Sequence, residues 1–187
     1  MTSPTSASAR TDAAERHLDP DERLLLLART RAHSPGAERA VSRFSRLGEH
    51  AAVWLAIGAA GWAIDRRRAQ AWRRALGRVA FTYVLNTALK RIIRRPRPEL
   101  PGLPALTSTP SALSFPSAHA STSFAGARCY ARMGLPSSIL YALAWSLSLS
   151  RLYLGVHYPS DVVAGAALGT LMGRERPPGE RGVGATP

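Results

Sequence analysis

The middle of this sequence has few acidic residues, and the whole chain has a single cysteine. Cys129 alone allows no intrachain disulfide and no thiolate metal cluster. Of the twelve acidic residues, only Asp65, Glu99 and Asp161 lie between positions 51 and 173. No group of Asp, Glu, His or Cys has metal-ligand spacing, so we expect no metal and no other cofactor.

The net charge of +13 raises the question of nucleic-acid binding. That function would require a basic face with stacking aromatic residues or a known motif, and the sequence has neither. The arginines instead flank apolar runs, as cations do in the loops of membrane proteins. We therefore expect membrane lipids as partners and no nucleic acid.

The first 33 residues are mostly polar and contain no apolar core of signal-peptide type. Residues 1 to about 20 have a composition typical of disorder, and a short helix is predicted around Leu24–Leu27. Ser34 and Pro35 then predict the start of another helix, in which Val41, Phe44, Leu47 and Ala51 recur at helical spacing. This amphipathic helix is equally typical of the membrane interface and of packing against the rest of the protein.

Five apolar segments follow, and each has at most a few charged residues. None reaches the roughly 20 residues of an ideal span, but each can be extended by polar residues that face the bundle. Small residues are frequent in them, which suits close helix packing in lipid. A soluble bundle is the alternative, but such runs lack the polar face of a soluble helix. The segments are Ala51–Ile64, Ala75–Leu89, Ala118–Arg132, Met133–Ser150 (beginning near Pro136) and Val162–Gly173.

The sequence therefore predicts an all-α, membrane-embedded helical bundle. It would have about five transmembrane helices and a preceding amphipathic helix. Residues 34–174 would form the domain, residues 1–33 a polar and partly disordered tail, and residues 175–187 a disordered tail. Residues 96–116 hold six prolines and predict a long loop, which in a compact domain is usually functional.

Two of three polar clusters flank this loop. Lys90 lies in the last turn of the second apolar segment, and Arg97 stands between two prolines that restrict its backbone. After the loop, Ser117 is placed to cap a helix whose free N–H groups could hold phosphate, with His119 close by. Taken separately, the first cluster is better explained as a basic membrane edge and the second as a capped helix with a surface histidine.

The third cluster, residues 150–161, has fewer structural explanations. Asp161 precedes an apolar run and would be costly near a membrane without a partner. His157 lies four residues before it, and a histidine that donates one ring N–H to a carboxylate keeps its other nitrogen available as a base or nucleophile. Arg151 adds a fork of donors suited to phosphate oxygens.

Together the clusters resemble the type 2 phosphatidic acid phosphatase family, which also contains the vanadium-dependent haloperoxidases. Its three motifs occur in order with the family's internal spacing, and the resemblance covers about residues 50–173. The matching residues are Lys90, Arg97 and Pro98; Pro116, Ser117 and His119; and Ser150, Arg151, His157 and Asp161. The chain departs from the motif at Ala118, where the family has glycine. We expect alanine to be harmless there, because the position should already be helical.

The resemblance implies a phosphatase that acts on a lipid phosphate without metal. His157 would attack phosphorus, Asp161 would orient His157, and His119 would protonate the leaving oxygen. The phosphate would be bound by Lys90, Arg97, Ser117 and Arg151. Phosphatidate, phosphatidylglycerophosphate, polyprenyl diphosphate and polyprenyl-linked phosphosugars all remain possible substrates. A non-catalytic lipid-binding protein of the same fold and a haloperoxidase are the alternatives.

With five spans, all three motifs would fall on one face of a multi-pass cell-membrane protein. The distribution of arginine favours an extracytoplasmic site by the positive-inside rule. The opposite face would carry Arg66, Arg67, Arg68, Arg73, Arg74, Arg132, Arg174 and Arg176.

Overall fold

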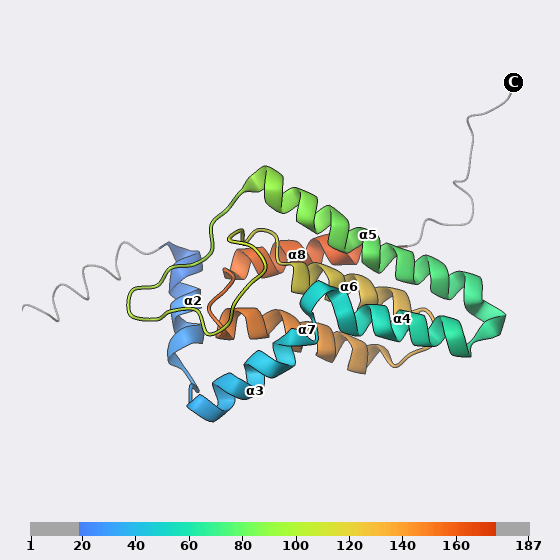
Figure 1. The fold of residues 1–187 in the computed structure, drawn as a ribbon, viewed down its shortest axis with the longest axis horizontal. Helices are drawn as coiled ribbons and strands as arrows, with labels where there is room; N and C mark the ends of the chain where they lie inside the picture. The colour runs from blue at the N-terminus through green and yellow to red at the C-terminus, as the bar shows by residue number, and fades with distance from the viewer. Residues whose placement is uncertain (1–18, 175–187) are drawn as a thin grey trace, which may run out of the picture.

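The computed structural model describes residues 19–174, and its regular structure in this range is entirely helical (Figure 1). This confirms the predicted all-α class. Arg176 and most of both predicted disordered segments lie outside the described residues. The helices are α2 (Pro20–Thr30), α3 (Pro35–Arg46), α4 (Ala52–Ile64), α5 (Ala69–Ile93), α6 (Ala118–Ala131), α7 (Ser137–Tyr153) and α8 (Pro159–Met172), with short 3₁₀ turns η1 (Glu49–Ala51) and η2 (Arg66–Arg68).

Helix α6 lies at the centre of the bundle and packs against α5, α7 and α8. Small residues on α8 make the closest of these contacts possible. A Cβ on Gly165 would lie 2.5 Å from the backbone oxygen of Ser117, and one on Gly169 would overlap the backbone oxygen of Ser121. The glycines therefore let α8 approach the backbone of α6, as small residues do where helices pack in lipid.

Aromatic residues fill the space between α6 and the α4–α5 pair. Trp54 is fully buried and donates from Nε1 to Ser123 Oγ at 2.9 Å. The Tyr130 hydroxyl donates to the backbone oxygen of Trp54 at 2.7 Å, and Trp72 packs against the Tyr130 ring. Both buried polar tips are thus hydrogen-bonded, which removes the cost of burying them.

The helix that begins at Pro35 ends earlier than its apolar spacing predicts. Ser34 caps it as expected, but α3 stops at Arg46 instead of continuing to Ala51. His50 and Ala51 both have left-handed backbone, with φ of 50° and 62°. Gly48, a weak helix former, packs in this break against the ring of His119. The break therefore turns the chain around a side chain from another helix.

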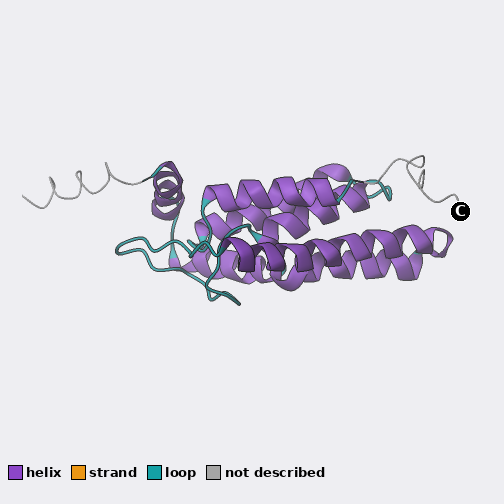
Figure 2. Ribbon diagram, turned by 90° about the horizontal axis from the view of Figure 1, so that it is seen from above, coloured by secondary structure: helices purple, strands orange, loops and turns teal. Residues whose placement is uncertain are grey.

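Helix α2 lies across one end of the bundle, as the two ribbon views show (Figures 1 and 2). It falls within the range that the sequence assigned to a polar tail, yet it packs against α7 and α8. Its buried Arg29 donates to the backbone oxygens of Tyr153, at 3.1 Å, and of Pro104, at 2.8 Å. The N-terminal segment is thus tied both to α7 and to the long loop.

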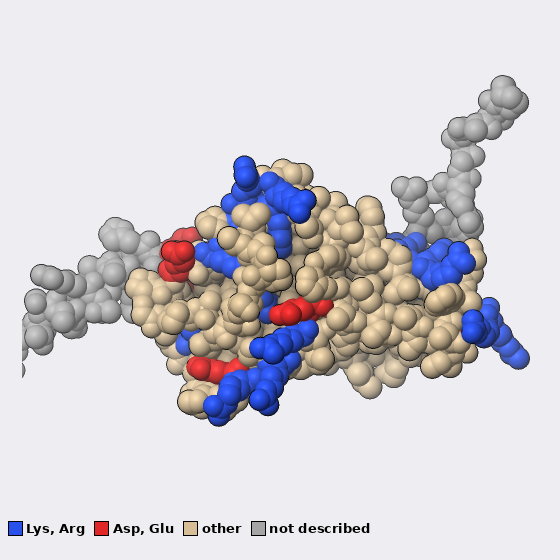
Figure 3. Space-filling model, in the orientation of Figure 1, with Lys and Arg blue, Asp and Glu red and all other residues tan. Residues whose placement is uncertain are grey.

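The exposed surface separates charge from apolar side chains. Basic residues gather near α3 and at the end of α5 where the long loop begins, and again at the opposite end of the bundle, with largely uncharged surface between them on the visible face (Figure 3). Taken one at a time, the helices within residues 19–174 fall short of the length and apolarity of a membrane span. Among these residues, one pair of consecutive helical segments satisfies the criteria when the two are taken as a single span. The pair is Pro35–Arg46 and Glu49–Ile64, and the chain bends by 48° between them.

Candidate active site

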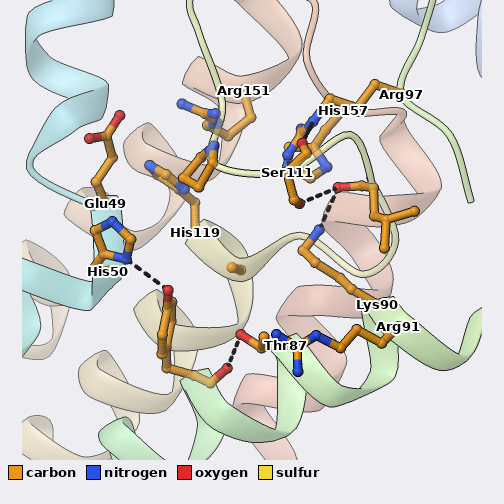
Figure 4. A pocket seen from close by; sticks show the side chains of 15 residues that line it. Glu49, His50, Thr87, Lys90, Arg91, Arg97, Ser111, His119, Arg151 and His157 are labelled. Carbon is orange, nitrogen blue, oxygen red and sulfur yellow. Dashed lines mark hydrogen bonds between the residues drawn. The ribbon is translucent and has the colours of Figure 1, made fainter. Parts of the chain in front are cut away.

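The three polar clusters meet at the end of the bundle where α2 and the long loop lie. Lys90 comes from the last turn of α5, His119 from the first turn of α6 and Arg151 from the last turn of α7. Arg97 comes from the loop, and His157 precedes α8. These five side chains line one cavity of about 240 Å³ (Figure 4). Residues separated by up to 67 positions in the sequence are thus brought around one space.

His157 and Asp161 form a buried pair. His157 Nδ1 lies 3.2 Å from Asp161 Oδ2, and that oxygen also accepts from the backbone N–H of Tyr158 at 2.9 Å. Because a carboxylate only accepts, Nδ1 carries the proton and Nε2 keeps a lone pair. Nε2 lies 3.2 Å from Arg97 Nη1 on the other side of the ring. The pair therefore presents a nucleophilic nitrogen toward a cation.

Backbone oxygens hold two of the cations. Lys90 Nζ donates to the backbone oxygens of Leu113, at 3.1 Å, and Ser114, at 2.6 Å. Arg97 donates to the backbone oxygens of Ser111 and Val156, at 2.8 and 2.6 Å. Burial lowers the pKa of Arg97 to about 10, so it stays charged at neutral pH. Within residues 19–174 neither side chain has a carboxylate partner, which leaves their positive charge for an anion.

Arg151 completes the group of cations. It is 2% exposed, its Nη1 donates to Ser45 Oγ at 2.8 Å, and its Nε has no hydrogen-bond partner within the described residues. A buried guanidinium with an unsatisfied N–H is costly unless a ligand supplies an acceptor. An oxyanion in the cavity would be such a ligand.

Burial and the neighbouring cations lower the pKa of His157 well below its ordinary value, which keeps the imidazole neutral and nucleophilic.

His119 is held by the break between α3 and α4. Its Nε2 lies 2.9 Å from the backbone oxygen of Ser45. Since a carbonyl only accepts, Nε2 carries the proton there and Nδ1 is the site that can gain and lose one. A Cβ on Gly48 would lie 2.5 Å from His119 Cδ2, so the absence of a side chain at Gly48 allows this ring position.

The start of α6 agrees with the expected local structure. Ser117 is the N-cap, and Ala118 is the first helical residue, without a left-handed φ. The backbone at position 118 therefore does not require glycine. The Ser117 hydroxyl faces the first turn of its own helix, 3.5 Å from Ala120 N, and Ala118 and His119 line the cavity instead. A direct contact between Ser117 and phosphate stays a prediction.

Several residues of the site carry no signal in the sequence. Ser45, Gly48 and His50 precede the matched motifs, and nothing in their spacing points to α6 or α7. Arg95 looked like one more basic residue at a membrane edge, yet its Nη1 lies 3.0 Å from Asp161 Oδ1. The prediction that Asp161 needs a partner was the one available signal, although it pointed only to His157.

The donor set fits an anion better than a metal ion. Within residues 19–174, no three His, Cys, Asp or Glu side chains gather as they would around a metal. The cavity combines three cations with a histidine–carboxylate pair and a second histidine. This arrangement can bind a phosphate group, attack its phosphorus and protonate a leaving oxygen.

Comparison with known proteins supports this chemistry. The sequence model of the PAP2 superfamily matches residues 71–176. The chain is 42% identical over 136 residues to decaprenylphosphoryl-5-phosphoribose phosphatase of Mycolicibacterium smegmatis, covering 72% of this chain and 74% of that protein. It is 39% identical over 140 residues to the protein of the same name from Mycobacterium tuberculosis, covering 74% of this chain and 78% of that one.

The fold agrees with a solved relative. The crystal structure of a transmembrane PAP2-type phosphatidylglycerolphosphate phosphatase from Bacillus subtilis superposes with a TM-score of 0.67 at 26% identity, over 86% of each chain. The chain therefore belongs to the PAP2 superfamily. It is a phosphatase, as the resemblance of its three motifs implied.

Proposed function

We propose that the protein is a metal-independent membrane phosphatase that hydrolyses the phosphomonoester of a polyprenyl-linked phosphosugar through a phosphohistidine at His157. The observation that carries the proposal is the orientation of His157. Its Nδ1 is held by Asp161, and its Nε2 lies 3.2 Å from Arg97 Nη1 at the cavity. The phosphatase activity of the superfamily gives this geometry its chemical role.

In the first half-reaction, Lys90, Arg97 and Arg151 hold the phosphoryl oxygens. His157 Nε2 attacks phosphorus, the bond from phosphorus to the ester oxygen breaks, and His119 gives that oxygen a proton. Asp161 stabilises the positive charge that develops on the His157 ring. The three fixed cations neutralise the transition-state charge that Mg²⁺ neutralises in many phosphoryl-transfer enzymes.

In the second half-reaction, water replaces the alcohol. His119, now neutral, takes a proton from the water as its oxygen attacks phosphorus. The P–N bond to His157 breaks and inorganic phosphate leaves. One general acid and one nucleophile thus serve both steps, with water and the phosphate ester as the reactants.

The choice of a phosphosugar rests on the relatives and on the outer part of the cavity. Two relatives at about 40% identity are named for a decaprenyl-linked phosphoribose. Beyond the cations, the cavity is lined by polar side chains suited to sugar hydroxyls or a second phosphate, namely Glu49, His50, Tyr83, Thr87 and Arg91. His50 Nδ1 lies 2.7 Å from the Tyr83 hydroxyl, which orients both side chains.

Residence in a membrane is supported by the outer surface of the helices. Large apolar side chains on α4, α5, α7 and α8 are exposed, which a soluble bundle would avoid. They include Ile64, Phe81, Val84, Ile139, Trp145, Leu149, Val163 and Leu171. We assign α4–α8 as about five spans in the cell membrane, with the site on the extracytoplasmic side, where the arginine distribution favours it.

The test is a substrate panel with purified protein in detergent and EDTA. A polyprenyl-linked phosphosugar, phosphatidate and a polyprenyl diphosphate are compared by release of inorganic phosphate. We expect the phosphosugar to have the highest kcat/KM, by at least about tenfold or 1.4 kcal/mol. A brief acid-free quench should trap phosphohistidine at position 157.

Each competing function has its own result in the same experiment. Binding of the lipids without release of phosphate from any of them would indicate the non-catalytic module. Halide oxidation in the presence of vanadate and hydrogen peroxide would indicate a haloperoxidase. A strict requirement for Mg²⁺ would contradict the assigned roles of the three cations.

A further inference from the structure

The carboxylate of Asp161 has two oxygens, and only one of them serves His157. Oδ2 accepts from His157 Nδ1 and from the backbone N–H of Tyr158. Oδ1 accepts from Arg95 Nη1 at 3.0 Å. Asp161 itself is 0% exposed, so protein groups must supply its hydrogen bonds. Arg95 is the cation that pairs with this buried carboxylate from behind the nucleophile.

Arg95 is in turn held from three sides. Its Nη2 donates to Asp21 Oδ2 at 2.8 Å, and its Nη1 also donates to Ser160 Oγ at 2.6 Å. The guanidinium carbon lies 3.9 Å from the centre of the Tyr158 ring, in cation–π contact. Two carboxylates and a ring face thus fix the plane of one guanidinium, which aims its Nη1 at Asp161.

Asp21 is the end of this chain of contacts. It lies in the first turn of α2, outside residues 71–176 that match the family. One of its oxygens accepts from the backbone N–H of Ser160 at 2.9 Å, at the N-terminus of α8. Burial acts to raise the pKa of Asp21, but the hydrogen bonds from Ser160 and the charge of Arg95 lower it overall, so it is ionised at neutral pH. A negative charge also suits this helix end.

We propose that Arg95 and Asp21 are positioning residues of the phosphatase: Asp21 orients Arg95, and Arg95 holds Asp161 so that its Oδ2 faces His157. The inference rests on the proposed role of His157 as nucleophile. Neither residue lines the cavity, so neither contacts the phosphate. Their effect is on how readily the His157–Asp161 pair reaches the geometry of attack, and not on how tightly the cations bind phosphate.

The expected size of the effect follows from geometry. Without Arg95, the buried Asp161 loses its ion pair and can rotate or take up a proton more readily, and either change misorients His157. A misplacement of about 1 Å in a reacting group can cost roughly 10²-fold in rate. Removing the charge of Asp21 leaves the contact between Arg95 and Asp161 in place but loosens the guanidinium, so its effect should be smaller.

The test uses the full chain in detergent and an activated ester, p-nitrophenyl phosphate, for which protonation of the leaving group matters little. We expect Arg95→Gln to lower kcat about 30- to 100-fold and Asp21→Asn about 3- to 10-fold, with KM and the Ki of inorganic phosphate within about threefold of wild type. Phosphoenzyme formation in a single turnover should slow by the same factors. Glu22→Gln removes the same charge one residue away on α2 and should leave kcat unchanged.

The two positions should also depend on one another. In the double variant, the loss should stay close to that of Arg95→Gln alone, because Asp21 reaches the Asp161 side chain through Arg95, and its contact with the backbone of Ser160 is a separate and smaller contribution. Arg95→Lys keeps the charge but lacks the fork that reaches two carboxylates. Arg95→Lys should recover part of the kcat lost in Arg95→Gln. In the Arg95→Lys background, Asp21→Asn should have little further effect on kcat.

Three results would overturn the inference: additive losses in the double variant, a weaker Ki for phosphate with unchanged kcat, or an unchanged rate in Arg95→Gln. A variant that fails to fold would lose phosphate binding as well, and Arg95→Lys then carries the same test. Failure of the proposed function is distinguishable, because wild-type protein would then form no phosphohistidine at position 157.

Discussion

Gly48 sets the position of His119, and its replacement by alanine is a sharp test of the general acid. The backbone at Gly48 has φ of −88° and ψ of −7°, which alanine adopts without strain. A Cβ there would lie 2.5 Å from His119 Cδ2 and 3.0 Å from Nε2. Non-bonded carbon atoms pack at about 3.5–4.0 Å, so the ring must withdraw by roughly 1 Å.

Such a movement disturbs the hydrogen bond that orients His119. The distance of 2.9 Å from Nε2 to the backbone oxygen of Ser45 would lengthen or the ring would turn, and Nδ1 would move from the position that the proposed mechanism requires for protonating the leaving oxygen. General acid catalysis contributes roughly 10²- to 10⁴-fold, and a 1 Å displacement costs about 10²-fold. We therefore expect Gly48→Ala to lower kcat/KM on a lipid phosphate by about 30- to 100-fold, or about 2–2.7 kcal/mol.

The assay compares two leaving groups. On a lipid phosphate the departing alkoxide needs a proton, whereas p-nitrophenolate departs largely unaided. Gly48→Ala should therefore lose less than about fivefold on p-nitrophenyl phosphate. Gly77→Ala is the matched control, since a Cβ at Gly77 in α5 meets nothing within 4 Å and should leave both rates unchanged. Equal losses on the two substrates, or no loss on the lipid phosphate, would refute the role assigned to His119.

Three other outcomes follow from the site and its packing. His157→Ala should be inactive on every substrate, whereas His119→Ala should keep a larger fraction of the p-nitrophenyl phosphate reaction and accumulate phosphohistidine; measured kcat/KM values in the reverse pattern would exchange the two roles. Activity should survive EDTA and be inhibited by vanadate, which mimics the trigonal-bipyramidal phosphorus; loss of activity in EDTA and its recovery with Mg²⁺ would contradict this. Gly169→Ala should lower the melting temperature in detergent by several degrees, because the new Cβ overlaps the backbone oxygen of Ser121 and overpacking costs about 1–3 kcal/mol; an unchanged melting temperature, as expected for Gly77→Ala, would mean that the contact between α6 and α8 is looser.

Several helix starts were predictable because capping residues mark them, whereas α5 (Ala69–Ile93) extends beyond both ends of the apolar segment Ala75–Leu89. Ser34 and Pro35, Pro136 and Ser117 mark helix starts in the sequence, and α3, α7 and α6 begin there. The break after α3 was not predictable, because Val41, Phe44 and Ala51 keep helical spacing through it. At the break Gly48 packs against His119, some 70 positions away, and spacing along one segment carries no information on such a partner.

The meeting of the three clusters was predictable from the sequence, while the roles of their residues stay predictions. Lys90, Arg97, His119, Arg151 and His157 line one cavity, as three ordered motifs at helix ends implied. The residues that hold these side chains in place come from α2, the α3–α4 break and the loop. Their contacts are made by ordinary serines, glycines and backbone oxygens, whose types say nothing about which distant group they will meet. Only the fold brings them together.

The single cysteine offers a practical route to the orientation of the protein in its membrane. Cys129 is buried near the C-terminal end of α6, with its Sγ 4.0 Å from the backbone oxygen of Gly173. A thiol enclosed in this way should react slowly with a bulky, membrane-impermeant maleimide. Ser108 and Arg67 are both exposed and lie in connections at opposite ends of the bundle, so cysteines introduced there one at a time could be labelled on intact cells without removing the native Cys129. The connection that reacts would lie outside the cell.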